Sequence, residues 1–89
     1  MDFPLLVSIT DAVERQGADE TTVASLRQAY PDLFFTLCGD DDIPARLAPA
    51  LKREGFNVYL ADARDHCVSL TTDIEGATGV VFATVADDD

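Results

Sequence analysis

The spacing of the apolar residues changes after the first third of the chain, and this change constrains the fold more than any other feature. Over residues 3–16 apolar side chains recur every three or four positions, which is typical of one buried helix face. Residues 20–29 repeat the pattern in a shorter form, and an aspartate precedes each segment where a helix cap belongs. From residue 33 onward the pattern becomes strand-like. The sequence therefore predicts two N-terminal helices followed by a sheet.

Four strands and one more helix are predicted in the rest of the chain. Apolar and β-branched residues cluster in four strand-like stretches, at about residues 33–38, 56–61, 66–72 and 79–85. Asp42 or Asp41 can cap a third helix that has Pro44 in its first turn and ends at Gly55. The predicted fold is α+β in the order ααβαβββ, with a four-stranded mixed sheet and the helices on one face. A right-handed crossover through the third helix would make the first two strands parallel.

Length and composition fit one small domain. A chain of 89 residues with 47% apolar residues can bury one core. We predict a single domain over residues 1–86 and a disordered acidic tail over residues 87–89. No apolar run approaches the roughly 20 residues of a membrane-spanning helix, and the first residues lack the basic start of a signal peptide. Two cysteines do not form a secreted disulfide scaffold. We therefore expect a cytoplasmic protein.

The charge of the chain argues against two classes of partner. Acidic residues outnumber basic ones 17 to 6, for a formal net charge of −11. Contact with nucleic-acid phosphates or with anionic lipids needs clustered Lys and Arg side chains, so no nucleic acid and no membrane is expected as a partner. Aspartate is the main acid, and Lys52 is the only lysine. Such a surface fits either a salt-adapted host or an acidic mesophilic protein.

The polar residues that could bind a ligand or take part in a reaction are predicted to meet at one edge of the sheet. Cys38 and Asp62 would end two parallel strands, and His66 and Cys67 would begin the next one. Asp40 follows the first strand in a run of three aspartates. These side chains could bind a transition metal or a metallocluster. Their spacing matches no common metal motif, and helix capping or apolar packing accounts for the same residues. We therefore expect no cofactor, with a metal site as the alternative.

The nucleophilic side chains form no pattern that indicates catalysis. His66 and Cys67 are neighbours on a predicted strand, so their side chains point to opposite faces of the sheet. Gly76 and Gly79 lie in a turn between strands and do not form a phosphate-binding loop. The sequence predicts no catalytic residue and no enzyme.

One face of the predicted sheet is left without helices. Phe34, Tyr59 and either Val81 or Phe82 would point from this face, whose strand interiors carry no charge. A solvated face is common in antiparallel sheets, but exposed apolar groups gathered on one face are also typical of an interaction surface. We take Phe34, Tyr59 and Phe82 as candidate anchors of an interface with a second copy of the chain or with another protein.

The stretch from Phe35 to Leu70 resembles a known family. It contains the segments FTLCGDDDIPARL, EGFNVYL and DHCVSL. These are similar to a small family of uncharacterised bacterial proteins associated with nitrogen-fixation gene neighbourhoods. The resemblance covers nearly the whole chain and brings no catalytic residues with it. It implies a cytoplasmic accessory role beside metallocluster assembly.

The leading hypothesis is a non-catalytic accessory or adaptor domain that acts through protein–protein contact, as a homodimer. The alternative is a small-ligand or metal-handling module, whose site would comprise Cys38, Asp40, Asp62, His66 and Cys67.

Overall fold

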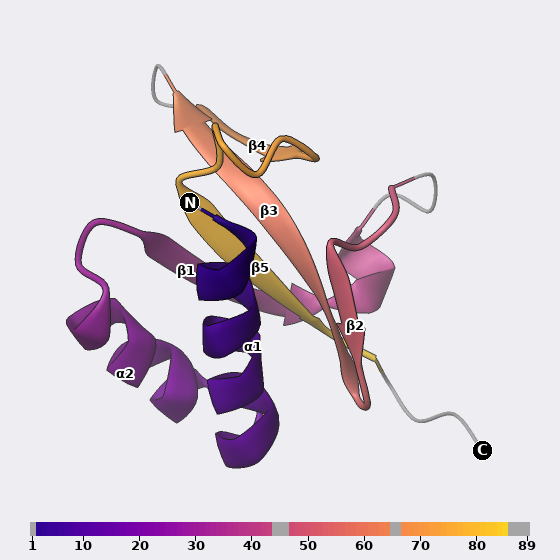
Figure 1. Cartoon of the computed structure of the whole chain (residues 1–89). Helices are drawn as coiled ribbons and strands as arrows, with labels where there is room; N and C mark the ends of the chain where they lie inside the picture. The colour runs from indigo at the N-terminus through magenta and orange to yellow at the C-terminus, as the bar shows by residue number, and fades with distance from the viewer. Residues whose placement is uncertain (1, 44–46, 65–66, 86–89) are drawn as a thin grey trace.

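Two helices pack on one face of a five-stranded sheet, so the predicted α+β class is confirmed (Figure 1). The computed structural model describes residues 2–43, 47–64 and 67–85. In chain order its elements are α1 (Phe3–Gln16), α2 (Glu20–Ala29), β1 (Phe34–Gly39), the 3₁₀ turn η1 (Asp40–Asp42), β2 (Leu51–Arg53), β3 (Phe56–Arg64), β4 (Cys67–Thr71) and β5 (Gly79–Thr84). The predicted tail at residues 87–89 lies outside the described residues.

Both helices begin at the predicted caps. The Asp2 carboxylate accepts a hydrogen bond from the Leu5 amide at 3.0 Å, and Asp19 accepts one from the Thr22 amide at 2.9 Å. Each bond satisfies one of the amides that a helix N-terminus leaves without an intrahelical partner. Gly17 ends α1 with a φ of 104°, a conformation that glycine adopts without strain. The two helices are therefore encoded by local signals.

The predicted third helix is wrong. After the single turn η1, the described residues up to position 55 contain no α-helix, and residues 51–53 form the short strand β2. Pro49 disfavours a helix here because it lacks an amide hydrogen and clashes with the preceding turn. The Ala50 amide instead donates to the Val58 carbonyl at 2.7 Å, which continues the contact between β2 and β3. Gly55, with a φ of 88°, forms the tight turn between these strands rather than the end of a helix.

The last strand lies inside the sheet. The strand order is β1-β5-β3-β2, and β4 also pairs with β3. β5 is parallel to β1 and antiparallel to β3, so β1 and β3 run in opposite directions. The prediction that the first two predicted strands, now β1 and β3, run in the same direction is therefore wrong, because no helix carries the chain across the sheet between them in the described residues. Leu60 and Ala61 pair with β5 and with β4 at once, which places β4 on the same side of β3 as β2.

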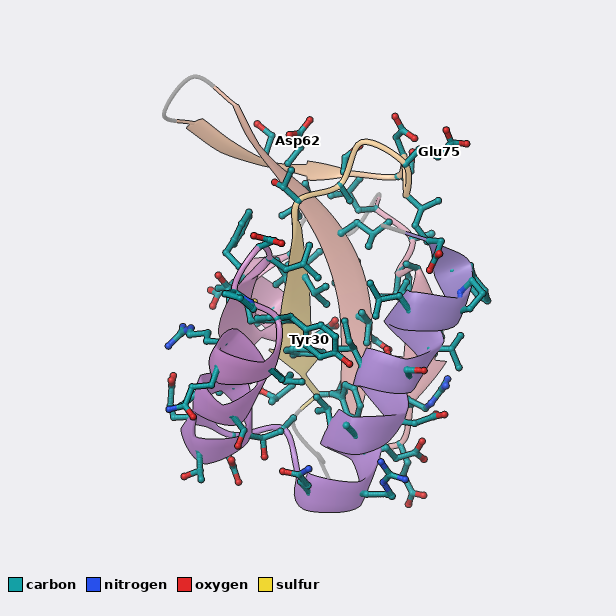
Figure 2. The ribbon with its side chains drawn as sticks, turned by 60° about the vertical axis from the view of Figure 1, so that its left-hand side comes forward. Tyr30, Asp62 and Glu75 are labelled. Carbon is teal, nitrogen blue, oxygen red and sulfur yellow. The ribbon has the colours of Figure 1, made fainter. Side chains whose placement is uncertain are left out.

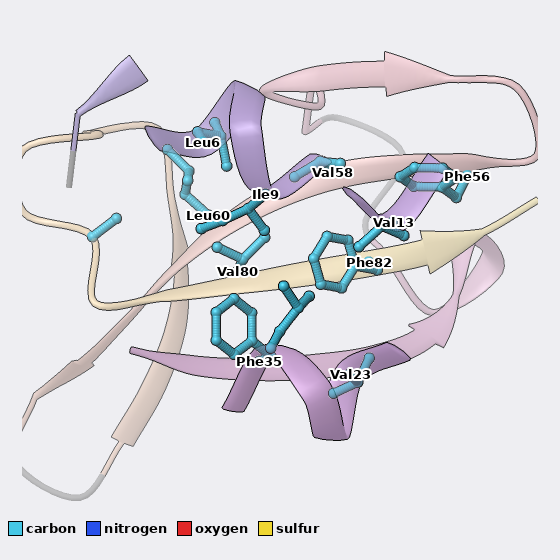
Figure 3. Packing of buried hydrophobic residues seen from close by; sticks show 12 residues of the cluster. Leu6, Ile9, Val13, Val23, Phe35, Phe56, Val58, Leu60, Val80 and Phe82 are labelled. Carbon is cyan, nitrogen blue, oxygen red and sulfur yellow. The ribbon is translucent and has the colours of Figure 1, made fainter. Parts of the chain in front are cut away.

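The main core fills the space between the helices and the sheet. Apolar side chains from both helices and from β1, β3 and β5 meet there (Figure 3). Phe82 lies at the centre with none of its surface exposed, and its ring stacks on Phe35 with the ring centres 6.3 Å apart. The ring of Phe56 approaches Phe82 edge-on at the same centre-to-centre distance. This layer holds most of the buried apolar residues among those described, and burial of apolar side chains is the main source of stability in a fold.

The opposite face of the sheet is covered rather than bare. Tyr59, Ala61, Val81 and Ala83 are buried there. The partly buried apolar side chains that pack on them include Ile43 and Leu47 from the segment after η1, and Leu70 from β4. The predicted uncharged open face is therefore wrong, because the residues assigned to a third helix instead cross to this side.

Candidate functional site

The predicted metal-ligand residues lie at opposite ends of the sheet. Cys38 is level with Ala83 at the end of β5, whereas Asp62 lies one residue beyond the pair formed by Ala61 and Gly79 at its start. Asn57 is level with Cys38 on the other side of β5, and Asp62 lies five positions farther along β3, which is about 16 Å at the usual rise per residue. The backbone of Cys67 lies near Asp62, and His66 falls outside the described residues. The prediction that these residues share one edge is wrong, because β3 runs opposite to β1 (Figure 1). Among the described residues no group of three metal-ligating side chains is found.

Asp40 is held by two side chains of β3. The Asn57 amide donates to the Asp40 carboxylate at 3.0 Å, and the Tyr59 hydroxyl donates to the same oxygen at 3.4 Å. These contacts tie η1 to the covered face of the sheet, at the point where the chain leaves β1. A part-buried carboxylate that accepts two bonds is satisfied in place. Asp40 therefore stabilises this chain reversal.

The Cys38 thiol stands beside the same acidic turn. Burial raises its pKa, and the nearby charges of Asp42, Asp40 and Asp41 raise it further. The pKa of Tyr59 is also raised, first by burial and then by Asp40. A thiol with a raised pKa stays protonated at neutral pH and is a poor nucleophile or metal ligand. The electrostatics at this end of the sheet thus oppose thiolate chemistry.

The three candidate interface anchors have different positions. Phe82 is wrong as an anchor, because it points into the main core; Val81 is the residue that lies on the opposite face. Tyr59 is also wrong as an exposed anchor, since only 7% of its surface is accessible. Phe34 is partly buried, and its ring lies directly over Gly79, where a Cβ would overlap the ring carbons. No solvent-facing aromatic cluster therefore forms from these three residues.

The outer edge of β1 is a feature that the sequence patterns did not indicate. The Phe34 amide donates toward β5, to the Thr78 carbonyl at 3.2 Å. Backbone groups alternate in direction along a strand, so those of Thr36 and Cys38 also face β5, and those of Phe35 and Leu37 face outward. In the described part of the chain no strand pairs with this side of β1. The Phe35 carbonyl accepts a hydrogen bond there from the Arg27 guanidinium, at 3.0 Å.

A family model of proteins of unknown function (DUF6129) matches residues 5–85. The chain belongs to this family. The match runs from the first turn of α1 to the residue after β5, so it covers the helices and every strand of the sheet. No curated protein and no solved structure gives a significant match.

Two further features of the DUF6129 chain concern its helices. In the part of the chain that the structure describes, neither helix is long and apolar enough to cross a membrane. A hollow of about 290 Å³ lies between α1 and α2, lined mainly by small uncharged side chains such as Ala12 and Ser25, with Tyr30 beside them. Figure 2 shows Tyr30 between the two helices, in front of the sheet. Its ring also contacts Phe35, with the ring centres 6.3 Å apart, so Tyr30 helps to join α2 to β1.

Proposed function

We propose that this DUF6129 protein is a non-catalytic accessory domain that acts by contact with another protein, and that the outer edge of β1 is the surface it uses. The observation that carries the proposal is the outward-facing backbone of Leu37, for which the described residues supply no strand partner. An exposed strand edge is a template for pairing with another chain, and many recognition domains bind extended segments in this way.

The placement of the chemically versatile residues supports a role without catalysis. Asp40 serves the fold, Cys38 is surrounded by acidic groups, and Asp62 lies at the far end of the sheet. A reaction site needs such groups within hydrogen-bonding reach of one another. The proposed function therefore uses the backbone of the sheet rather than these side chains.

The cellular setting belongs to the same proposal. The resemblance to proteins of nitrogen-fixation gene neighbourhoods favours a cytoplasmic accessory role beside metallocluster biogenesis. The excess of aspartate over other charged residues favours a salt-adapted host. A second copy of the chain, which would give the homodimer expected from the sequence, is the other candidate occupant of the β1 edge.

The test compares two substitutions at Leu37. Leu37→Pro removes the outward amide and blocks pairing, whereas Leu37→Ala keeps the amide although it removes more of the side chain. A photo-crosslinker at the exposed position 36 would be introduced into both variants in the native host. We expect the proline variant to lose crosslinks that the alanine variant retains. Identical crosslinks from both variants, with both proteins folded, would contradict the use of this edge.

A further inference from the structure

We propose that the segment bound by β1 is an extended strand of a partner protein, with a short apolar or β-branched centre flanked by Lys or Arg residues. This inference rests on the proposed function and adds the chemistry of the partner. It follows from three properties of the edge: its length, the role of Arg27, and the charge at its two ends.

The length of β1 defines how much chain can pair with it. The strand spans six residues, Phe34–Gly39, without an interruption, and pairs with β5 at every position. Its outward backbone groups, at Phe35 and Leu37, can exchange hydrogen bonds with about five residues of an added strand. Thr36 is exposed on the face opposite the helices, so an incoming side chain can lie beside it. β-Branched and aromatic residues are the types that pack well at such positions.

Arg27 occupies part of the edge in the absence of a partner. Its guanidinium reaches from the last turn of α2 to the Phe35 carbonyl at 3.0 Å. An incoming strand would place a backbone amide at this carbonyl instead. Because Arg27 is exposed over much of its length, its side chain can turn into solvent without disturbing the core. Arg27 thus satisfies the edge while it is empty and keeps it from pairing indiscriminately.

Acidic side chains stand at both ends of the edge. Asp32 is exposed just before β1, and Asp41 and Asp42 are exposed just after it. The Asp41 carboxylate lies over Gly39, since a Cβ at Gly39 would be 2.6 Å from its Oδ1 atom. A bound strand would therefore meet negative charge at either end, whichever direction it runs. Lys or Arg at the flanks of the strand complements this arrangement.

The same charge disfavours a second copy as the occupant. Each chain carries a formal net charge of −11. Pairing two β1 edges would bring the acidic side chains at the ends of one strand close to those at the ends of the other. Like charges at an interface cost free energy and slow association. A basic segment avoids both penalties. The partner inferred from the edge is consequently basic and extended, rather than another molecule of this protein.

The test uses synthetic peptides and the full chain. The probe has a Val-Thr-Val-Thr-Val centre with two lysines at each end, and its matched control has glutamates in place of the lysines. Binding is followed by NMR shifts of the β1 amides, together with the molecular mass of the protein at the same concentrations. We expect the lysine peptide to shift the Phe35 and Leu37 amides, and the glutamate peptide to leave them unchanged. Added salt should weaken binding.

Variants of the protein test which carboxylates and which strand edge the lysine peptide contacts. Asp41→Asn and Asp42→Asn together should weaken binding by about two- to fivefold for each carboxylate that is neutralised. Asp73→Asn with Glu75→Gln, an equal change of charge in the loop before β5, should leave it unchanged. Leu37→Pro should abolish binding and Leu37→Ala should retain it. If Leu37→Pro fails to fold, the lysine peptide with N-methylated backbone amides tests the same backbone pairing. This peptide is expected not to bind.

Several outcomes would overturn the inference. Equal binding of the two peptides would show that charge does not select the partner. Self-association through β1 at these concentrations would make a second copy the occupant. If neither peptide binds but crosslinking in cells still depends on the Leu37 amide, the proposed function stands and the basic partner does not. If both experiments fail, β1 is not a binding edge.

Discussion

The two outer edges of the sheet are built in different ways. One edge consists of β2 and β4, strands of three and five residues that lie end to end along β3. Lys52 and Arg53 stand on β2, and Arg53 is tied to α1 through Asp11 and Glu14 at 3.2 and 3.0 Å. The other edge is the continuous strand β1, and Arg27 of α2 is bonded to one of its carbonyls.

This difference indicates which edge is protected by its own construction. Short strands and charged side chains are the usual means by which proteins prevent unwanted pairing at a sheet edge. The β2/β4 edge has both, and a strand added there would have to follow two separate pieces. The β1 edge is a longer strand with regular pairing, and one exposed side chain, Arg27, is bonded to it. Four predictions test this contrast, beginning with the largest expected effect.

Proline substitution distinguishes the inner and outer backbone of β1. Thr36→Pro removes an amide that faces β5 and leaves the Val80 carbonyl without its partner. Compared with Thr36→Ala, we expect a loss of about 1–3 kcal/mol in the free energy of unfolding. Leu37→Pro, compared with Leu37→Ala, removes an amide that faces outward and should cost much less. Urea denaturation of the four variants measures both differences, and equal losses would refute the assigned directions.

Removal of Arg27 should open the β1 edge further. Arg27→Ala leaves the Phe35 carbonyl without its donor, which we expect to cost about 0.5–1.5 kcal/mol of stability. The variant should also self-associate more readily than the native chain at high salt, where repulsion between acidic chains is screened. Arg15→Ala removes an exposed arginine from α1 and serves as the control. Light scattering that gives the same mass for both variants would contradict a protective role for Arg27.

The stability that Arg53 contributes at the β2/β4 edge should depend on the salt concentration. Arg53→Ala breaks two ion pairs with half-exposed carboxylates, each worth about 0.2–1 kcal/mol. The loss should shrink as sodium chloride screens the charges. Thermal unfolding at low and high salt checks this. No increase in self-association is expected, because β2 remains short; its appearance would weaken the contrast between the edges.

Cys38 provides a chemical probe at the end of β1. Burial and the aspartates of η1 raise its pKa, so in a Cys67→Ser background iodoacetamide should modify it more slowly at pH 8 than an unstructured cysteine. The folded state binds this proton more tightly than the unfolded state does. Its contribution to stability is therefore complete below the ordinary thiol pKa of about 8.5 and is lost as the pH rises through the folded value. Asp42→Asn should lower the pH midpoint of modification, and an unchanged midpoint would argue against this electrostatic effect.

Local signals make most of the elements predictable. The caps at Asp2 and Asp19 and the stop at Gly17 define the helices, and alternation identifies β1 and β3. The helical spacing of Ile43, Leu47 and Leu51 favours a third helix that does not form. In the structure, Ile43 and Leu47 instead pack on the face of the sheet opposite the helices, and Leu51 is the first residue of β2. Spacing alone does not distinguish these uses, although Pro49 argues against the helix.

The position of β5 could not be read from local patterns. Strands adjacent in sequence are usually neighbours in a sheet, yet β5 lies between β1 and β3. Its apolar run from Val80 to Ala83 is buried on both faces, so alternation does not show that Phe82 rather than Val81 enters the main core. The candidate metal site depended on the same topology. The β1 edge could not be predicted either, because it exists only once the strand order is known.

Amide hydrogen exchange along β1 tests the central claim most directly. The backbone amides of Thr36 and Cys38 face β5, and the amide of Leu37 faces outward. We expect slow exchange at Thr36 and Cys38 and fast exchange at Leu37, measured residue by residue by NMR under conditions where the chain stays folded. This alternation would establish β1 as an open edge. Equal protection of all three amides would show that the edge is covered and would contradict the account.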